Sequence, residues 1–221
     1  MRTFERTLVR DSATIALAAA MVGVSFGVAA AGKGIPFEQI QFMSLTVFAG
    51  GSQFVLVGAV GSGVGAAVVA GLVLNARHIA YGLSLAPVLD GPLWRRALSS
   101  QIVIDESTVY PLAQPELRLA RQGFYAVGVF LFVSWQVGTA IGALAGEAID
   151  DKAFGIDAAF PAGLLAMLGP QLNSRSARLA AVLGAAIAVA STPLLPRGVP
   201  ILVAAVGGLI AFAVDTPAES A

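Results

Sequence analysis

The chain of 221 residues has no cysteine and only one histidine, His78. The lack of cysteine excludes disulfides, thiol catalysis and thiolate ligands for a metal. A single histidine cannot supply the cluster of imidazoles that a zinc site without cysteine needs. We therefore expect neither a metal site nor a cofactor.

Charged residues are also scarce, at 12% of the chain, and the 13 basic and 13 acidic side chains cancel to a net charge of zero. The basic residues never form a run, so the chain lacks the positive patch by which proteins bind nucleic acid. The glycine-rich loop ending in Lys and Ser or Thr, which holds nucleotide phosphates, is missing as well. We expect no nucleic-acid partner and no nucleotide-driven motor.

Hydrophobic residues, in contrast, make up 57% of the chain, and its mean hydropathy is +0.83. Soluble domains carry about a quarter of charged residues, so this composition is typical of an integral membrane protein surrounded by lipid. Crossing about 30 Å of hydrocarbon takes roughly 20 helical residues. Uncharged stretches of about this length or longer cover residues 12–32, 39–76, 122–146, 158–174, 179–196 and 198–214.

These stretches predict an all-α, polytopic membrane protein with about seven transmembrane helices, some of them interrupted. We expect one transporter domain over residues 1–221. In the third stretch the glycines are spaced four apart, which predicts a face that packs closely on another helix; they are Gly138, Gly142 and Gly146.

The N-terminus carries Arg2, Arg6 and Arg10 before an apolar stretch from Ala13 to Ala31. A secretory signal has an apolar core of only about 7 to 15 residues, so this longer stretch is better interpreted as the first spanning helix. Basic residues gather on the cytoplasmic side of membrane proteins. The three arginines therefore predict a cytoplasmic N-terminus.

The longest uncharged stretch contains a polar, glycine-rich interruption at residues 48–54, Phe-Ala-Gly-Gly-Ser-Gln-Phe. At membrane depth such a break persists only where it lines a cavity or is buried in protein, as in transporters. A half-helix beginning there would present free N–H groups and a positive dipole to a carboxylate. The alternative is close packing of helices at the glycines. We predict substrate binding by Phe48, Gly50, Gly51, Ser52 and Gln53.

Residues 24–28, Val-Ser-Phe-Gly-Val, are similar to residues 133–137, Val-Ser-Trp-Gln-Val, and each lies within a long apolar stretch. Ser25 and Ser134 are 109 positions apart (134 − 25), and aromatic residues followed by small ones recur 112 apart at Phe48 and Phe160 (160 − 48). This spacing predicts a duplicated unit over residues 12–88 and 122–195. Interrupted segments near 50 and 162 would then mark the substrate site. Ser25 and Trp135 join the candidate substrate-binding residues, although Trp135 also suits a core.

The segment 75–81, Asn-Ala-Arg-His-Ile-Ala-Tyr, follows apolar sequence without a turn signal. On a helix Asn75, His78 and Tyr81 would share one face, with Arg77 about a quarter-turn away. An arginine in a span costs at least about 2.5 kcal/mol on insertion scales, so it normally faces a polar cavity or a partner. The alternative is that Arg77 and His78 lie at the membrane boundary and end the helix. We predict that all four residues contribute to the substrate site.

The segment 101–110, Gln-Ile-Val-Ile-Asp-Glu-Ser-Thr-Val-Tyr, encloses two adjacent carboxylates in apolar sequence. If it is helical, Gln101, Asp105 and Thr108 share a face. A buried carboxylate prefers its neutral form unless it is paired, so Asp105 and Glu106 are candidates to carry protons or to pair with Arg77. The alternative is a cytoplasmic amphipathic helix with solvated acids. The pattern leaves open whether residues 97–113 cross the membrane.

Four elements of the chain, in this order and at these spacings, resemble the AzlC family, the large subunit of two-component branched-chain amino acid exporters. They are residues 25–27, 48–54 and 75–81 and the pair Asp105 and Glu106. The resemblance covers nearly the whole chain and implies export of hydrophobic amino acids, most often valine, leucine or isoleucine, across the bacterial cytoplasmic membrane. It also implies a small hydrophobic partner subunit of the AzlD type.

A zwitterionic amino acid needs an anion site, a cation site and an apolar pocket. Arg77 or the backbone of Gly50 and Gly51 would hold the carboxylate, and Asp105 or Glu106 the ammonium group. The side chain would contact three aromatic residues, Phe48, Phe54 and Trp135. Because the nucleotide loop is missing, uphill export would use the proton gradient or the membrane potential.

Two other classes of protein remain as alternatives. An intramembrane serine hydrolase would use Ser52 as nucleophile and His78 as base, with glycine N–H groups stabilising the oxyanion. Phe54 stands where the nucleophile motif Gly-x-Ser-x-Gly has its last glycine, which argues against it. A non-transporting scaffold subunit would explain the glycine faces but would leave Arg77 in a span without a purpose.

Overall fold

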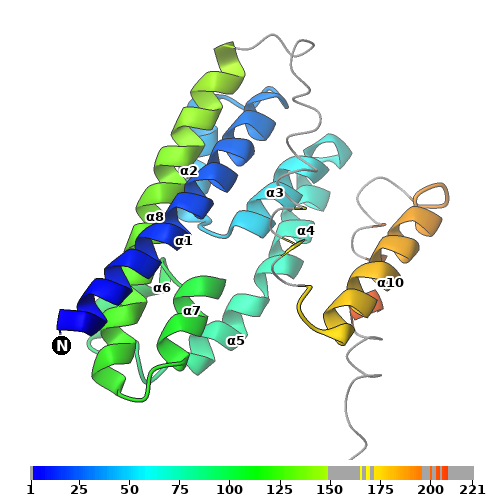
Figure 1. Ribbon diagram of the computed structural model, residues 1–221. Helices are drawn as coiled ribbons and strands as arrows, with labels where there is room; N and C mark the ends of the chain where they lie inside the picture. Colours follow the sequence, from blue (N-terminus) through cyan, green and yellow to red (C-terminus); the bar gives the residue numbers. More distant parts are fainter. Residues whose placement is uncertain are drawn as a thin grey trace, which may run out of the picture.

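The computed structural model describes residues 2–148, 165, 168–169, 172–195, 200, 203–204 and 206–208. These residues form helices and turns, without a strand among them, which confirms the predicted all-α class (Figure 1). Besides the short 3-10 helix η1 (Val60–Ser62), the helices are α1 (Arg2–Ala31), α2 (Phe37–Thr46), α3 (Gly50–Ala59), α4 (Val64–Asn75), α5 (Arg77–Ser84), α6 (Leu93–Ser100), α7 (Asp105–Leu112), α8 (Leu117–Ala148) and α10 (Arg175–Ser191).

Three helices of the described part are long and apolar enough to cross a membrane. They are Leu8–Ala31 in α1, Val64–Ser84 across α4 and α5, and Leu117–Gly146 in α8. The predicted spans 158–174 and 198–214 lie largely outside the described residues. The number seven therefore stays a prediction.

The helices α1 and α8 run side by side in the same direction (Figure 1). Gly138 lies against Ala20 and Gly142 against Val24, while Gly146 lies against Val28 one turn further on. Small residues at such an interface let two backbones approach each other, which is how helices associate in lipid. The predicted packing face of α8 is thus confirmed, and its partner is α1.

Gly142→Ala tests how close this approach is. A Cβ on Gly142 would overlap the backbone carbonyl of Val24, so the two helices would have to separate. Overpacking of this kind lowers the free energy of unfolding by about 1–3 kcal/mol, which thermal unfolding in detergent would show as a lower melting temperature. Gly65→Ala in α4 is the control, because nothing lies within 4 Å of its added Cβ. Equal melting temperatures of the two variants would contradict the close approach.

The helices α2 and α3 form a re-entrant pair that enters from the end of the molecule where α1 ends (Figure 1). The amide of Gln136, near the middle of α8, donates to the carbonyl of Ser44 at 3.1 Å, so α2 ends at mid-length of α8. There Phe48 packs edge-on against Phe132, with ring centroids 5.1 Å apart. The chain then turns back as α3. The predicted interruption is confirmed and lies at residues 47–49.

The helices α6 and α7 form a second re-entrant pair, which enters from the opposite end. The Ser99 hydroxyl lies 2.8 Å from that of Tyr125, and Ile102 packs on Gly128, so α6 rises along the first half of α8. Tyr110 of α7 then packs on Gly123, because the chain has turned back. The shared face considered for Gln101, Asp105 and Thr108 on a single helix is therefore not formed. Residues 101–104 are the non-helical tip of the pair.

The two re-entrant pairs occupy equivalent positions in two successive units of the chain. The spans that precede them begin 56 positions apart (64 − 8), and α3 and α7 begin 55 apart (105 − 50). Leu85 and Leu89, after the second span, pack on Phe124 near the beginning of α8, so this span runs opposite to α1. Each unit is a span followed by a re-entrant pair, and the units have opposite orientations.

The longer repeat predicted over 12–88 and 122–195 extends into residues outside the described part and stays a prediction. Its matched helices α1 and α8 do run parallel. The matched aromatic residues Phe26 and Trp135 stack on each other at 5.9 Å, and Phe54 meets Phe26 edge-on at 5.4 Å. These three rings form the centre of the core between α1, α3 and α8.

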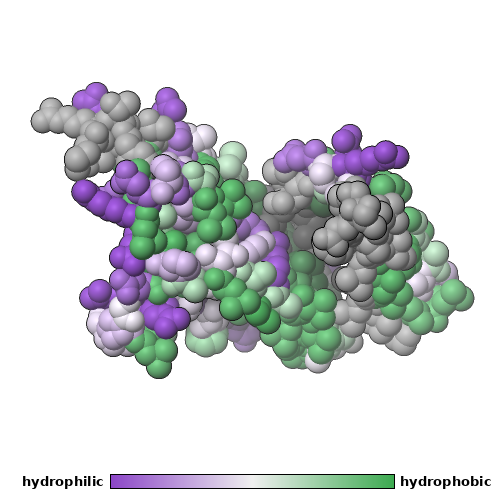
Figure 2. Space-filling view, turned by 90° about the horizontal axis from the view of Figure 1, so that it is seen from below, coloured by the Kyte–Doolittle hydropathy of each residue, from purple (hydrophilic) through white to green (hydrophobic). Residues whose placement is uncertain are grey.

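Most basic residues of the first 148 positions lie at the end of the molecule where α1 and α8 begin. Seen from this end, hydrophilic residues gather over the side with α1, α6 and α8 (Figure 2). Arg95 and Arg96 begin the second re-entrant pair there, and Arg121 pairs with Asp90 at 3.0 Å. Residues 97–113 form neither one spanning helix nor one continuous amphipathic helix, because the chain turns at residues 101–104 and α7 runs back along α8.

Candidate functional site

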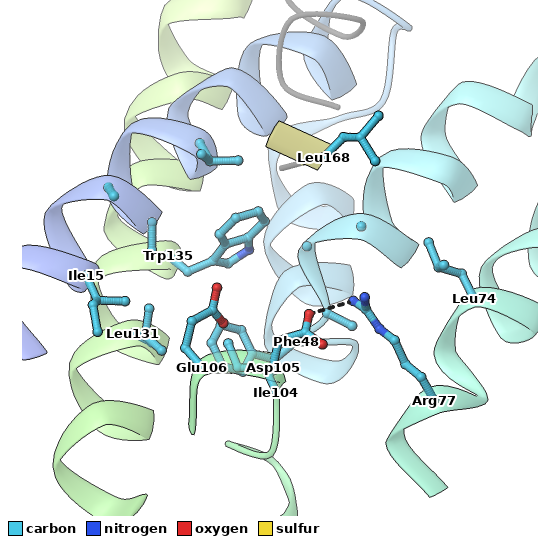
Figure 3. Close-up of a pocket in the computed structure, with 16 residues that line it drawn as sticks. Ile15, Phe48, Leu74, Arg77, Ile104, Asp105, Glu106, Leu131, Trp135 and Leu168 are labelled. Carbon is cyan, nitrogen blue, oxygen red and sulfur yellow. Dashed lines mark ion pairs between the residues drawn. The ribbon is translucent and has the colours of Figure 1, made fainter. Parts of the chain in front are cut away.

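The tips of the two re-entrant pairs meet at mid-length of the spanning helices, next to a cavity of about 360 Å³ (Figure 3). The amide of Gln101, at the second tip, donates to the carbonyl of Leu45 at 2.7 Å, at the first. The cavity is lined by Ile15, Ala18, Ala19, Val22, Phe48, Ala49, Gly50, Gly51, Leu74, Arg77, Ile104, Asp105, Glu106, Leu131, Trp135 and Leu168. Its size is that of a small-molecule site.

The floor of the cavity contains an ion pair between a spanning helix and a re-entrant tip. The Arg77 guanidinium of α5 lies 3.1 Å from Asp105 Oδ2, and the Tyr81 hydroxyl donates to Asp105 Oδ1. Both oxygens of Asp105 therefore have partners on α5. The pairing of Asp105 with Arg77, one of the two roles considered for it, is what the structure shows.

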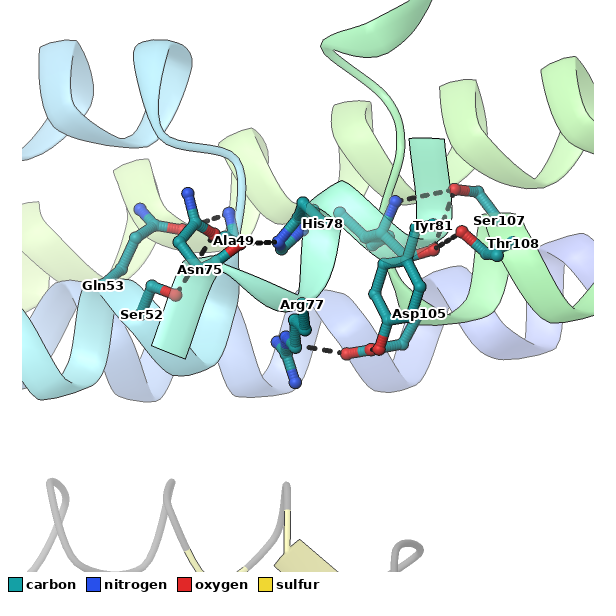
Figure 4. A network of polar contacts seen from close by, with 11 residues as sticks. Ala49, Ser52, Gln53, Asn75, Arg77, His78, Tyr81, Asp105, Ser107 and Thr108 are labelled. Carbon is teal, nitrogen blue, oxygen red and sulfur yellow. Dashed lines mark hydrogen bonds and ion pairs between the residues drawn. The ribbon is translucent and has the colours of Figure 1, made fainter. Parts of the chain in front are cut away.

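A chain of hydrogen bonds ties this span to α3 on the other side of Arg77 (Figure 4). The Ser52 hydroxyl of α3 donates to Asn75 Oδ1 at 3.2 Å, and His78 Nδ1 lies 3.0 Å from the carbonyl of Asn75. Ala76, between α4 and α5, keeps helical backbone angles, so Val64–Ser84 runs on as one span. The rings of His78 and Tyr81 lie 5.4 Å apart and His78 contacts Asn75, so the predicted common face of Asn75, His78 and Tyr81 is confirmed. They form a supporting layer behind the cavity.

The carbonyl groups that end α2 are satisfied by side chains from the rest of the fold. Gln136 binds the carbonyl of Ser44, and Gln101 binds that of Leu45. A helix leaves its last carbonyls without intrahelical partners, so these two amides neutralise the negative end of α2. At the first tip, therefore, these two carbonyl acceptors at the end of α2 are already bonded, and the groups left to bind a ligand are N–H donors.

The N-terminus of α3 is the open end of this tip. Its N-cap residue is Ala49, whose side chain cannot accept a hydrogen bond, and Gln53 is the first residue whose N–H bonds back to Ala49. The N–H groups of Gly50, Gly51 and Ser52 have no acceptor within the described part of the chain. Gly50 and Gly51 both line the cavity.

Glu106 is the second acid of the α7 tip, and it differs from Asp105. Its exposed side chain lines the cavity, and none of the ion pairs within the described residues includes it. Figure 3 shows its carboxylate below the indole of Trp135. The cavity therefore holds one paired cation, one paired anion and one unpaired carboxylate.

The structure brings seven of the predicted site residues to the cavity and leaves six outside its lining. Those that line it are Phe48, Gly50, Gly51, Arg77, Asp105, Glu106 and Trp135. Ser52, Asn75, His78 and Tyr81 support it through the contacts above, and Gln53 is fully buried behind Ala49. Ser25 donates to the carbonyl of Met21 in its own helix. Phe54, expected to touch the substrate side chain, belongs to the core instead.

Sequence reasoning missed the apolar wall from α1 and the residues that join the tips. Ile15, Ala18 and Ala19 carry no polar signal, and only the geometry of α1 places them at the cavity. The role of Gln101 and Gln136 had a signal: each is an amide inside an apolar stretch, which needs a buried hydrogen-bond partner.

The serine hydrolase alternative requires a hydrogen bond between Ser52 and His78. The two side chains have other partners in the structure, since Ser52 contacts the Asn75 amide and His78 the Asn75 carbonyl. The geometry thus gives Ser52 a structural contact between α3 and α4.

The fold and the cavity define a polytopic α-helical membrane protein in which opposed half-helices surround a charged cavity at mid-depth. Residues 14–149 match the family described as AzlC protein, and the chain belongs to this family. This range contains all three described spans nearly in full and both re-entrant pairs.

Relatives of similar length are known from other organisms. An uncharacterized membrane protein of Archaeoglobus fulgidus is 32% identical over 88% of this chain and 87% of its own length. One from Helicobacter pylori is 25% identical, over 76% of each chain. The inner membrane protein YgaZ of Escherichia coli is 27% identical over 63% of this chain and 60% of its own. No solved structure matches this chain.

Proposed function

We propose that this protein is a secondary transporter that exports branched-chain or other hydrophobic amino acids from the bacterial cytoplasm. The observation that carries the proposal is the cavity at the meeting point of the two re-entrant tips. Broken helices around a cavity at mid-depth are the usual construction of substrate sites in secondary transporters. A scaffold subunit would have no need of charged residues there, because they are costly in a membrane.

The chemistry of the cavity suits a zwitterion with an apolar side chain. One side presents the donors of α3 and the other the unpaired carboxylate of Glu106, while Ile15, Val22 and Leu131 supply apolar surface. An amino acid places a carboxylate and an ammonium group a few ångströms apart. Substrates with a second charge would bring an uncompensated charge against the apolar wall, at a cost of several kcal/mol.

We further propose a cytoplasmic N-terminus and a small hydrophobic partner of the AzlD type in the inner membrane. Six arginines support this orientation, because they lie at the end where α1 begins and Lys33 is the basic residue at the other end within positions 2–148. They are Arg6, Arg10, Arg95, Arg96, Arg118 and Arg121. Energy would come from the proton gradient or the membrane potential.

Reconstitution in liposomes tests the function. The purified chain, alone and with its partner, would be sealed in vesicles loaded with unlabelled leucine, and the entry of labelled leucine would be followed. We expect counterflow that isoleucine and valine inhibit and that glutamate and lysine do not. An absence of leucine flux in both preparations would reject the proposed function.

Glu106→Gln tests the coupling to protons. Glutamine still accepts a hydrogen bond from an ammonium group but cannot take up a proton, so exchange of leucine for leucine should persist at higher leucine concentrations. Accumulation driven by a pH gradient should be lost, because no group would carry the proton. Unchanged accumulation with the same pH dependence would place the coupling group elsewhere. Glu116→Gln, beyond the end of α7, is the matched control.

A further inference from the structure

The two re-entrant tips are equivalent in position but opposite in the charge they offer. α7 begins with Asp105 and Glu106, whose carboxylates lie in its first turn, whereas α3 begins with Gly50 and Gly51. Acids in the first turn compensate the positive end of a helix dipole. The α7 tip is therefore already neutralised by its own side chains, and the α3 tip is not.

The charge of Arg77 in the cavity is already compensated. A terminal nitrogen of its guanidinium lies 3.1 Å from Asp105 Oδ2, and Asp105 also accepts from Tyr81, so little net positive charge remains there for a second carboxylate. Besides Arg77 Nε, which has no hydrogen-bond partner, the open donors within the described part of the cavity are the N–H groups at the beginning of α3 and one further group.

That further donor is the indole N–H of Trp135. The side chain is buried, with an exposed fraction of 5%, it lines the cavity, and Nε1 has no hydrogen-bond partner. Figure 3 shows the indole nitrogen pointing into the cavity. A buried N–H without a partner costs about 1–3 kcal/mol, so an indole in this state is suited to receive a ligand acceptor.

We propose that the two tips divide the charges of the amino acid: the N-terminus of α3 and Trp135 Nε1 bind its carboxylate, and Glu106 binds its ammonium group. The Arg77–Asp105 pair then holds the second tip to the spanning helix. Trp135 acts as a hydrogen-bond donor and not only as an apolar wall. This inference rests on the proposed function and assigns the orientation of the substrate.

Three ligands with the same apolar side chain test the carboxylate and the ammonium group of the substrate separately. They are L-leucine, 3-methylbutylamine, which lacks the carboxylate, and 4-methylpentanoate, which lacks the ammonium group. Their affinities for the full-length protein, purified in the form that transports leucine, would be measured by calorimetry. Trp135→Phe keeps an aromatic ring but removes the donor. We expect it to weaken leucine and 4-methylpentanoate by about 10- to 100-fold and to change 3-methylbutylamine less than about threefold.

Glu106→Gln should give the reverse pattern, with weaker binding of leucine and the amine and unchanged or tighter binding of 4-methylpentanoate. An equal loss of all three probes in Trp135→Phe would make Trp135 a packing residue and overturn the inference. Because the wild-type protein would still transport leucine in that case, the proposed function would survive. A wild-type protein that neither binds nor transports leucine would reject both.

A second measurement does not depend on the analogues. The chain has two tryptophans, and the other one, Trp94, is 61% exposed on α6, so Trp94→Phe leaves Trp135 as the single indole. The indole N–H of ¹⁵N-labelled protein then gives one NMR signal. We expect saturating leucine to shift its proton downfield, as a new hydrogen bond to a carboxylate requires. An unmoved signal in leucine-saturated protein would overturn the proposal.

Discussion

Replacing Arg77 with alanine is expected to lower leucine transport by at least about tenfold, the equivalent of 1.4 kcal/mol, while membrane insertion stays the same or improves. Insertion should become easier because a charge is removed from a span. Transport should fall because Asp105 loses the partner that holds its tip, and a carboxylate without its counter-ion remains next to the cavity. Counterflow per inserted molecule, normalised to protein in the vesicles, measures the effect.

Two variants show whether the loss of transport in Arg77→Ala comes from breaking this ion pair or from removing any positive charge. Arg77→Ala combined with Asp105→Asn removes both charges and should recover part of the lost transport, because no unpaired carboxylate is left. Arg121→Ala breaks the ion pair with Asp90 at the water-facing end, and exposed pairs contribute only about 0–1 kcal/mol. Its transport should stay within about twofold of wild type. An equal effect of Arg77→Ala and Arg121→Ala would exclude Arg77 from the site.

The second large effect is expected from Gly50→Val or Gly51→Val, which should abolish transport. Both glycines line the cavity, so a branched side chain at either position would fill the space in which the substrate approaches the N–H groups of α3. Conformational freedom is not the reason: the described glycines with positive φ are Gly34, Gly63 and Gly91. Gly65→Val, with open space around it, is the control and should transport normally. Normal counterflow in Gly50→Val and Gly51→Val would show that the beginning of α3 does not contact the substrate.

The first tip was predictable from the sequence because it carries its own signal. Gly-Gly-Ser-Gln in an uncharged stretch is polar and helix-breaking, and lipid tolerates that only at a cavity. The predicted pairing of Asp105 with Arg77 was predictable for a similar reason, since two opposite charges inside apolar sequence need each other. Gly138 and Gly142 likewise indicated their own packing face.

The second tip was not predictable in the same way. Residues 101–110 contain no glycine or proline, and the polar residues Gln101, Asp105 and Thr108 recur with a helical period, so the pattern is that of one helix. Its break is stabilised by one tertiary contact and one local contact: Gln101 binds the first tip, and the Ser107 hydroxyl caps the beginning of α7 by accepting from the N–H of Ile104 at 2.9 Å. The cavity wall formed by α1 was not predictable either. Ala18 and Ala19 line the cavity only because of how α1 packs, and nothing in the sequence distinguishes them from other alanines of the helix.

A hydrophobic amino acid that occupies the cavity between the two tips should shield its wall from reagents, and the absence of cysteine allows a direct test. Ala19→Cys places one thiol in the α1 wall of the cavity, and Ala113→Cys places one at the exposed end of α7. The rate of modification by a charged, membrane-impermeant thiosulfonate would be measured with and without leucine. We expect saturating leucine to slow modification of Ala19→Cys several-fold, glutamate to leave it unchanged, and Ala113→Cys to react equally in all conditions. Equal rates for Ala19→Cys with and without leucine, in protein that transports leucine, would contradict occupation of the cavity by leucine.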